Sequence, residues 1–210
     1  MQSNDPTLAE SIDETLLRAG FARSEDYVEL LRTSLRSDVA RHRVLALRGA
    51  VRQSLVTADD WLAALGDFDV TVRREALAQV AYVAIEDDRI LEVAVSLLDD
   101  RDPLVVDAAI FAIGEHFYAG AIEELCEIAT NHDDARCRES AVAALGAVGD
   151  DRGRGAIIAA LEDKAPVRRR AIVALANFEG PDIEAALERA RTDRDWQVRA
   201  AVDQLSADED

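Results

Sequence analysis

Residues 137–146 read CRESAVAALG, and related ten-residue segments recur along the chain. The shared pattern is Val-Arg-x-x-Ala-x-x-Ala-Leu-Gly, in which Cys137 replaces the valine of this copy. The copies begin at residues 40, 72, 105, 137, 167 and 198, so successive starts are 32, 33, 32, 30 and 31 residues apart. A fixed period of this length indicates repeat architecture, in which one supersecondary unit is stacked several times.

Each copy has the spacing of one helix face. In the copy that begins at residue 105, the apolar positions are Val105, Ala109, Ile110 and Ile113, which is a period of 3.6 residues. A residue able to cap a helix stands three positions before most copies, and such side-chain oxygens accept hydrogen bonds from the first free backbone N–H groups. These capping candidates are Ser37, Asp69, Asp102, Asp134 and Asp195, with Lys164 in this place before the fifth copy.

A second set of short apolar helices is expected between the copies. Their helical spacing covers residues 61–65, 90–98, 121–129, 156–161 and 183–190. A pair of helices of this size cannot bury its apolar face alone, whereas stacked pairs form a continuous core. We therefore predict one all-α domain over residues 1–210, with a capping helix at 6–24, repeats at 25–205 and an acidic tail at 206–210.

The repeat resembles HEAT repeats, and most of all the short HEAT-like repeats of phycobilisome lyase-type proteins. The segment ALGAVGD at residues 144–150 is similar to the consensus of that family, and the resemblance covers roughly residues 25–207. It implies a right-handed α-solenoid of about six helix-turn-helix units. It implies no particular activity, because the matching residues are those that stack one repeat on the next.

One arginine recurs at the same position of four copies: Arg73, Arg138, Arg168 and Arg199. In the resembling family this arginine braces neighbouring repeats through an aspartate, so a bracing role is expected here. The alternative is a ladder of guanidinium groups that binds a ligand. The copy at residue 105 differs, because Val106 stands where the arginine is expected.

The charge balance is strongly acidic, with 42 Asp and Glu residues against 24 Lys and Arg residues and a formal net charge of −18. Asp outnumbers Glu, 25 to 17, and Lys164 is the only lysine. Such a surface resembles that of proteins from salt-in halophiles, in which carboxylates keep the protein soluble when molar salt screens charges within about 3 Å. On this interpretation the acidity says little about a partner.

The expected location is the cytoplasm. The start of the chain has neither the basic nor the apolar region of a signal peptide, and the longest nearly apolar run, residues 104–114, is too short for a membrane span and contains Asp107. Cys126 and Cys137 lie in helical apolar patterns and are expected to be reduced thiols, with a redox pair as the alternative.

The sequence offers little support for catalysis. The only histidines are His42, His116 and His132, and none stands in the repeated His-Glu pairs of HEAT-type iron hydroxylases. Paired acids such as Asp133-Asp134 lack the spacing and glycine of a calcium loop, and no phosphate loop, nucleophile elbow or zinc pattern is found. We therefore expect neither an enzyme nor a bound metal or cofactor.

The leading functional hypothesis is a protein-interaction scaffold that binds another protein on the concave face of the solenoid. Aromatic residues are scarce, so a group of them on that face would form a binding patch. The alternative is that Phe111 and Phe117 only fill gaps beside small neighbours. The candidate contact residues are Tyr82, Asp107, Phe111, Glu139, Arg169 and Arg170.

Two further hypotheses concern other partners. Residues 151–200 hold ten basic and nine acidic residues, which leaves 14 basic and 33 acidic residues for the rest of the chain. The arginines of this segment could bind nucleic acid or an acidic partner. A factor for chromophore or cofactor maturation is less favoured, because no nucleophile stands beside a base. The protein is expected to be a monomer.

Overall fold

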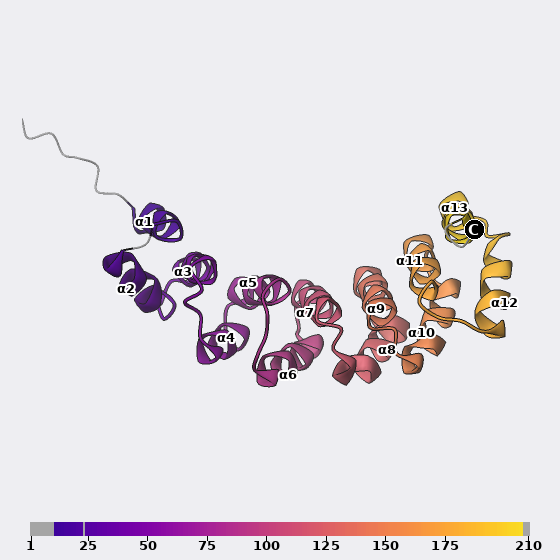
Figure 1. Ribbon diagram of the computed structural model, residues 1–210, viewed down its shortest axis with the longest axis horizontal. Coiled ribbons are helices and arrows are strands. Elements are labelled where there is room, and N and C mark those ends of the chain that lie inside the picture. Colours follow the sequence, from indigo (N-terminus) through magenta and orange to yellow (C-terminus); the bar gives the residue numbers. More distant parts are fainter. Residues whose placement is uncertain (1–10, 23, 208–210) are drawn as a thin grey trace, which may run out of the picture. The chain divides into compact units, whose positions relative to one another are not determined.

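The computed structural model describes residues 11–22 and 24–207, and this part of the chain is helical nearly throughout (Figure 1). Within it there are thirteen α-helices, four short 3-10 helices and no β-strand. The predicted all-α solenoid of helix pairs is confirmed. The helices group into two compact units, of which unit 1 ends at Gln79 and unit 2 begins at Val80.

Unit 1 holds the first five helices. These are α1 (Ile12–Ala19), α2 (Glu25–Ser34), α3 (Ala40–Arg52), α4 (Ala58–Leu65) and α5 (Val70–Val80), the last of which ends at the boundary. Helix α1 packs on α2 and α3, and the buried residues of this cluster include Leu16, Leu31 and Leu45. Burying such a side chain contributes about 1.5–3 kcal/mol, so α1 is held mainly by apolar contact.

Helix α1 lies within the region predicted as an N-terminal capping helix. Ser11 caps α1 in an extended conformation: its hydroxyl accepts from the Glu14 backbone N–H, and the Glu14 carboxylate accepts from the Ser11 N–H. This capping box satisfies two backbone donors and fixes the start of α1 at Ile12. The rest of the prediction, residues 6–10, lies outside the described residues, as do residues 208–210 of the predicted tail.

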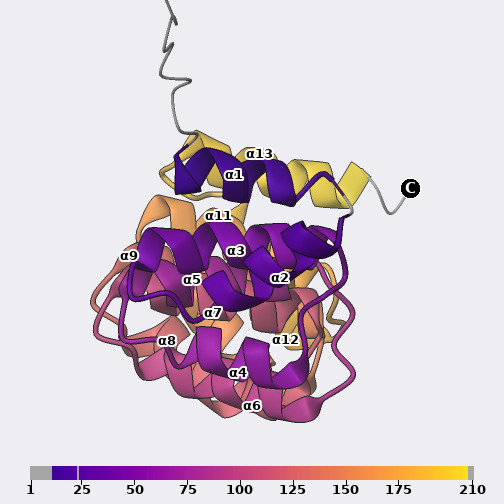
Figure 2. The same ribbon diagram turned by 90° about the vertical axis from the view of Figure 1, so that its left-hand side faces the viewer.

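Unit 2 holds the remaining helices. They are α6 (Asp88–Ser96), η1 (Leu97–Asp99), α7 (Pro103–Glu115), η2 (Ala119–Ala121), α8 (Ile122–Asn131), α9 (Ala135–Val148), η3 (Asp151–Gly153), α10 (Arg154–Ala159), η4 (Ala160–Glu162), α11 (Ala165–Leu175), α12 (Pro181–Ala190) and α13 (Trp196–Ala207). Helices α7, α9, α11 and α13 lie side by side in one row, and Figure 2 shows α6 and α8 in a second layer. The first row is the one predicted to line a concave face.

Most of the predicted caps are found. Asp69, Asp102, Asp134 and Asp195 each stand directly before a helix, and each carboxylate accepts from the backbone N–H two residues later at 2.8–2.9 Å. An aspartate in this position also interacts favourably with the positive end of the helix dipole. At the fifth copy, the predicted departure is also found, because Lys164 precedes α11 and makes no side-chain cap.

The cap predicted at Ser37 is wrong. Helix α3 begins at Ala40, and Val39 precedes it without a side-chain cap. The Ser37 hydroxyl instead accepts from the Val39 N–H at 3.2 Å, as the Asp67 carboxylate accepts from the Asp69 N–H before the next copy. The first copy of the repeat therefore begins at residue 42 rather than 40, and Arg43 occupies the position of the recurring arginine.

Glycines allow two close helix approaches in unit 2. A Cβ on Gly146 would lie 2.6 Å from the Cβ and 2.7 Å from the Cα of Ala174, and a Cβ on Gly114 would lie 3.1 Å from the Cβ of Ala144. The glycine of the repeat pattern thus lets α9 approach α11, and α7 approach α9, almost to backbone contact.

Candidate functional site

The recurring arginines lie at the junctions between repeats. Arg138 of α9 donates two hydrogen bonds to Asp163 at 2.6 and 2.8 Å, and Arg168 of α11 donates two to Asp193 at 2.8 and 2.7 Å. In both pairs the arginine also donates Nη1–H to a backbone carbonyl of the loop before its own helix. Each arginine therefore ties its own helix to the loop of the next repeat.

These ion pairs are strong local interactions. The hydrogen bonds to the guanidinium groups lower the pKa of Asp163 and Asp193, and those to the carboxylates raise the pKa of Arg138 and Arg168. The Arg168 side chain is only 5% exposed and that of Asp193 only 14%. Removing one member of such a pair leaves an uncompensated buried charge, which is strongly destabilising.

Unit 1 contains the same arrangement at a residue that was not predicted from the sequence. Arg43 donates two hydrogen bonds to Asp67, both at 2.7 Å, and a third to the Ser37 carbonyl. Arg73 and Arg199 donate to the corresponding loop carbonyls, of Asp67 and Asp193. The signal for Arg43 was present in the sequence, because it stands 30 residues before Arg73.

The ladder of Arg–Asp pairs is interrupted between α7 and α9. Val106 occupies the arginine position of α7 and is buried. The acceptor position of the next loop is held by His132, whose Nδ1 accepts from the Asp134 N–H at 3.0 Å as an aspartate does elsewhere. Both the cation and its carboxylate are thus replaced at one junction. The remaining polar link between the two helices includes the Ser140 hydroxyl, which donates to Asp107 at 2.5 Å.

Four of the predicted contact residues gather beside this junction, on a surface we call the second-helix face, which is the exposed side of α7, α9 and α11 together with Tyr82 from the segment after α5. Phe111, Glu139 and Arg170 line a pocket of about 320 Å³ in this face. The Tyr82 ring lies 5.9 Å from the Phe111 ring at an interplanar angle of 59°. This tilted geometry is favourable for an aromatic pair.

The hollow exists because small residues stand opposite a large one. Ala143 and Ala147 of α9 line the pocket together with Phe111 of α7. Ala143 occupies the same repeat position in α9 as Phe111 does in α7. At this position α7 therefore has an aromatic ring and α9 only a methyl group. Tyr82 is 76% exposed and Phe111 43% exposed, so much of both rings remains in contact with water.

Charged groups surround the aromatic pair. Glu115 lies one turn after Phe111 on the same helix, lines the pocket and is exposed. Glu139 faces Arg170 at 3.7 Å, a longer separation than in the buried Arg–Asp pairs. Glu115 was not among the residues predicted from the sequence, although its spacing of four residues from Phe111 places both side chains on one helix face.

The other two predicted contact residues are placed differently. Arg169 of α11 donates to the Gln197 side chain at 2.9 Å and so faces α13. Asp107 accepts from Ser140 and is half-buried between α7 and α9. Phe117, in the loop after α7, is 64% exposed and has a positive φ of 49°, a conformation that is rare for a bulky residue.

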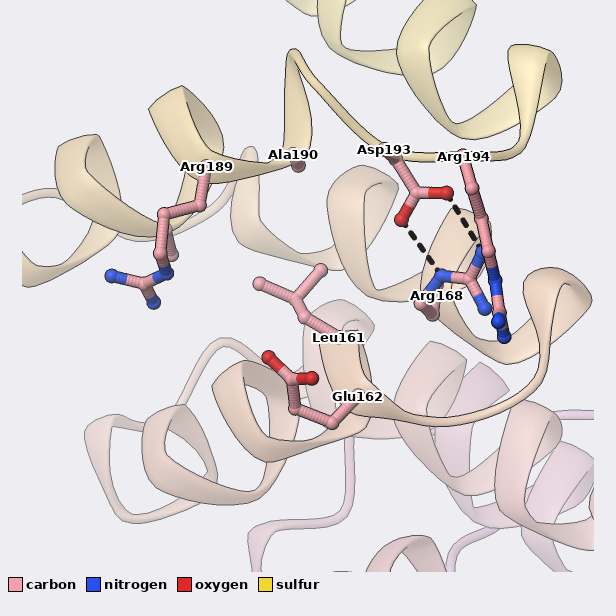
Figure 3. Close-up of a pocket in the computed structure, with 8 residues that line it drawn as sticks. Leu161, Glu162, Arg168, Arg189, Ala190, Asp193 and Arg194 are labelled. Atoms are coloured by element: carbon pink, nitrogen blue, oxygen red, sulfur yellow. Dashed lines mark hydrogen bonds and ion pairs between the residues drawn. The ribbon is translucent and has the colours of Figure 1, made fainter.

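The arginines of residues 151–200 do not form one basic surface. Figure 3 shows a second pocket, of about 380 Å³, between η4, α11 and α12, where Arg194 lies beside the Arg168–Asp193 pair and Arg189 lies on the opposite side. The Glu162 carboxylate also points into this pocket. Elsewhere Arg152 pairs with Asp150, and Arg154 with Asp151 and Asp182. Carboxylates therefore neutralise much of the charge that a nucleic-acid surface would need.

The cysteines are free thiols in the described structure. Burial raises the pKa of Cys137 to about 11 and also raises that of Cys126, so both thiols are protonated near neutral pH.

Among residues 11–22 and 24–207, no three His, Cys, Asp or Glu side chains gather as a metal-binding group. No helix in the same part of the chain has the length and apolar character of a membrane span.

Comparison with known proteins identifies the repeat. A family model described as HEAT repeats matches residues 58–145 and 122–206. No curated protein sequence shows significant similarity to the chain. HEAT and armadillo solenoids are typically non-catalytic scaffolds, so the match is informative about fold and about the general kind of function.

Several solved structures share the fold. An engineered protein is 20% identical, with a TM-score of 0.64 over 87% of this chain and 95% of its own. A designed armadillo repeat protein in complex with the peptide (KR)4 is 16% identical, with a TM-score of 0.59 over 94% of this chain and 99% of its own. The Escherichia coli protein YibA is 16% identical, with a TM-score of 0.64 over 96% of this chain and 75% of its own.

Proposed function

The chain belongs to the HEAT-repeat family, and from this premise we propose that it is a non-catalytic scaffold that binds a segment of a partner protein on its second-helix face. Repeat solenoids offer extended surfaces of this kind because each unit contributes one helix to a continuous row. The binding surface is the junction of α7 and α9, with Tyr82, Phe111 and the adjoining pocket at its centre.

The observation that carries this proposal is the exposed aromatic pair. Aromatic residues make up only 5% of the chain, yet Tyr82 and Phe111 lie together at the surface beside a hollow. Aromatic anchors next to pockets commonly supply most of the binding energy of protein interfaces. The same junction lacks the Arg–Asp pair, so its residues depart from the repeat at several positions at once.

The shape of the site favours an extended segment. The pocket of about 320 Å³ accommodates one or two side chains rather than a whole domain. The row of α7, α9 and α11 continues on either side of it, and neighbouring side chains of an extended chain could contact these helices. The designed armadillo protein of similar fold is in complex with a peptide, which is consistent with this mode of binding.

A charge placed in the aromatic pair tests the proposal. Phe111→Asp is expected to release the partner that wild-type protein retains from a lysate of the source cells at high salt, because it removes the ring that supplies the contact area of the aromatic pair. Val173→Asp is the matched control, since Val173 occupies the same repeat position in α11 and is 53% exposed.

The measurement is quantitative mass spectrometry of the co-purifying proteins for the wild type and both variants. Circular dichroism and thermal unfolding establish that both variants fold. Partners lost with Phe111→Asp but kept with Val173→Asp would support the proposal. An unchanged set of partners for a folded Phe111→Asp variant would refute it.

A further inference from the structure

Two exposed rings elsewhere in this protein each have one of its own arginines above one face. The Arg52 guanidinium lies 4.1 Å from the centre of the Phe21 ring, and that of Arg43 lies 4.7 Å from the Phe68 ring. With these arginines in place, Phe21 is still 75% exposed and Phe68 83% exposed, so each cation contacts only one part of its ring. A cation over an aromatic face is attracted by the ring quadrupole. No guanidinium of the described residues occupies such a position over Tyr82 or Phe111.

Two carboxylates lie beside the Tyr82–Phe111 pair, where they could accept hydrogen bonds from a cation bound to these rings. Glu115 of α7 and Glu139 of α9 line the same pocket as Phe111, one from each side of the junction. Glu115 has no ion-pair partner among the described residues, and Glu139 lies 3.7 Å from Arg170. The distances of 2.6 and 2.8 Å between Arg138 and Asp163 show how much closer a fully formed pair is in this fold. Glu139 therefore retains accepting capacity.

We infer that the partner segment presents an arginine side chain to this site. Its guanidinium stacks on the Tyr82–Phe111 pair and donates hydrogen bonds to Glu115 and Glu139. Its aliphatic stem lies against Ala143 and Ala147. This inference rests on the proposed function, since it names the chemistry of the partner at the same surface.

Arginine fits the site better than other side chains. Its planar guanidinium combines stacking on a ring with several fixed donors, whereas the lysine ammonium is a more strongly hydrated point charge. A purely apolar anchor would fill the hollow but would desolvate Glu115 and Glu139 without compensation. Phosphate groups or an acidic peptide would meet two glutamates against the one cation of Arg170, and the net charge of the chain is −18.

A peptide with a neutral counterpart of arginine tests the inference. The probe is a fluorescently labelled octapeptide of alternating leucine and arginine, compared with the same peptide in which citrulline replaces arginine. Citrulline keeps the shape of the side chain and removes its charge. The titrations are run in molar KCl, where screening within about 3 Å suppresses long-range attraction to the acidic protein. The arginine peptide is expected to bind about 2- to 30-fold tighter, the range of a partly desolvated cation–π contact.

Protein variants locate the effect. Phe111→Leu keeps an apolar residue but removes the ring, and it is expected to abolish most of the preference for arginine over citrulline. Glu115→Gln is expected to reduce the preference about two- to fivefold, as for a partly exposed ion pair. Glu124→Gln, on the exposed side of α8, removes the same charge at a distance and is expected to leave the preference unchanged.

The outcomes separate this inference from the proposed function. Equal binding of the two peptides to wild-type protein, including no measurable binding of either at millimolar concentration, overturns the arginine inference. So does a preference that survives Phe111→Leu, or one that Glu124→Gln reduces as much as Glu115→Gln does. If Phe111→Asp still releases the cellular partner in those cases, the scaffold function stands with a different anchor.

Discussion

Two kinds of junction in unit 2 differ in what holds them together. Between α9 and α11, and between α11 and α13, an arginine binds an aspartate of the next loop with two hydrogen bonds; Arg168 is buried and Arg138 is half-buried. Between α7 and α9 the corresponding residues are Val106 and His132, and the surface above them carries the exposed Tyr82–Phe111 pair. The braced junctions follow the repeat pattern, and the unbraced junction departs from it.

A repeat protein can thus divide stability and recognition among its units. Residues that recur in every unit serve contacts that every unit makes, namely those to its neighbours. Residues that appear in one unit alone have no such general role. The departures Val106, Phe111 and His132 fall at one junction, so the residues of this junction are the ones that the requirement to stack does not explain.

The largest expected effect comes from removing one half of a buried pair. Arg168→Ala leaves the Asp193 carboxylate without its guanidinium, and we expect a loss of about 3–5 kcal/mol in the free energy of unfolding. Arg170→Ala, two positions along the same helix and 45% exposed, is expected to cost less than about 1 kcal/mol. Denaturant unfolding of both variants measures the difference, and equal losses would show that the buried pair braces nothing.

Close packing at the braced junction gives the next effect. Gly146→Ala would place a Cβ 2.7 Å from the Cα of Ala174, so α9 and α11 must move apart, at an expected cost of about 1–3 kcal/mol. Gly114→Ala at the unbraced junction meets Ala144 at 3.1 Å and is expected to cost less.

Gly155 supplies the control for this series. It lies within α10, and a Cβ added there would have no atom within 4 Å, so Gly155→Ala is expected to stabilise the helix by about 0.5–1 kcal/mol. Thermal unfolding of the three variants should rank them in this order. If Gly146→Ala lowers the stability less than Gly114→Ala does, α9 and α11 at the braced junction can move apart more easily than α7 and α9 can.

Acid should weaken the braced junctions through their carboxylates. Hydrogen bonds from arginine lower the pKa of Asp163 and Asp193, and the Arg136 side chain lowers that of the cap Asp134 to about 2. Because these folded-state pKa values lie below the unfolded ones, the stabilisation is present above about pH 4 and is lost as the pH falls below it, in the case of Asp134 towards about 2.

Hydrogen exchange between pH 5 and pH 2.5 would follow this loss helix by helix, after correction for the intrinsic exchange rate. We expect α11 and α13 to lose protection as the pH falls, and an Asp163→Asn variant to start less protected and change less. Protection in α11 that rises on acidification would contradict the assigned direction of the pKa shifts.

The sequence alone predicted the helices and most of their starts, because apolar spacing and capping aspartates are local signals. Asp69, Asp102 and Asp134 were placed correctly for this reason. The first copy was misplaced by two residues because His42 stands at an apolar position and Val39 at a cap position, so both local signals are weak there. Only the pairing of Arg43 with Asp67 fixes the register, and that pairing joins residues 24 positions apart.

The candidate site was predictable only in part. The sequence singled out Tyr82 and Phe111 as rare aromatic residues, and the structure places their rings together. The hollow beside them depends on how Ala143 and Ala147 face Phe111 across two helices, which no local spacing reveals. His132 occupies a position that holds an aspartate at the braced junctions. Its significance becomes clear only when the structure shows that Val106 occupies the arginine position of the same junction.

The last pair of expected effects concerns the residues that follow α7 and α9. Each helix is followed by a residue of positive φ. This residue is Phe117, at 49°, after α7, and Gly149, at 68°, after α9. A left-handed conformation costs a residue with a Cβ about 1–2 kcal/mol, whereas glycine adopts it readily. The unbraced junction thus carries backbone strain that the braced side avoids.

Exchanging the residue types at these two positions tests whether that strain is real. Phe117→Gly is expected to raise the free energy of unfolding by about 1 kcal/mol, since the 64% exposed ring contributes little packing. Gly149→Ala is expected to lower it by a similar amount, because nothing lies within 4 Å of the added Cβ and the backbone conformation alone opposes it. If Phe117→Gly instead destabilises the protein, the Phe117 ring makes contacts that outweigh the strain. If it stabilises the protein and also weakens partner binding, the Phe117 ring contacts the partner in addition to Tyr82 and Phe111.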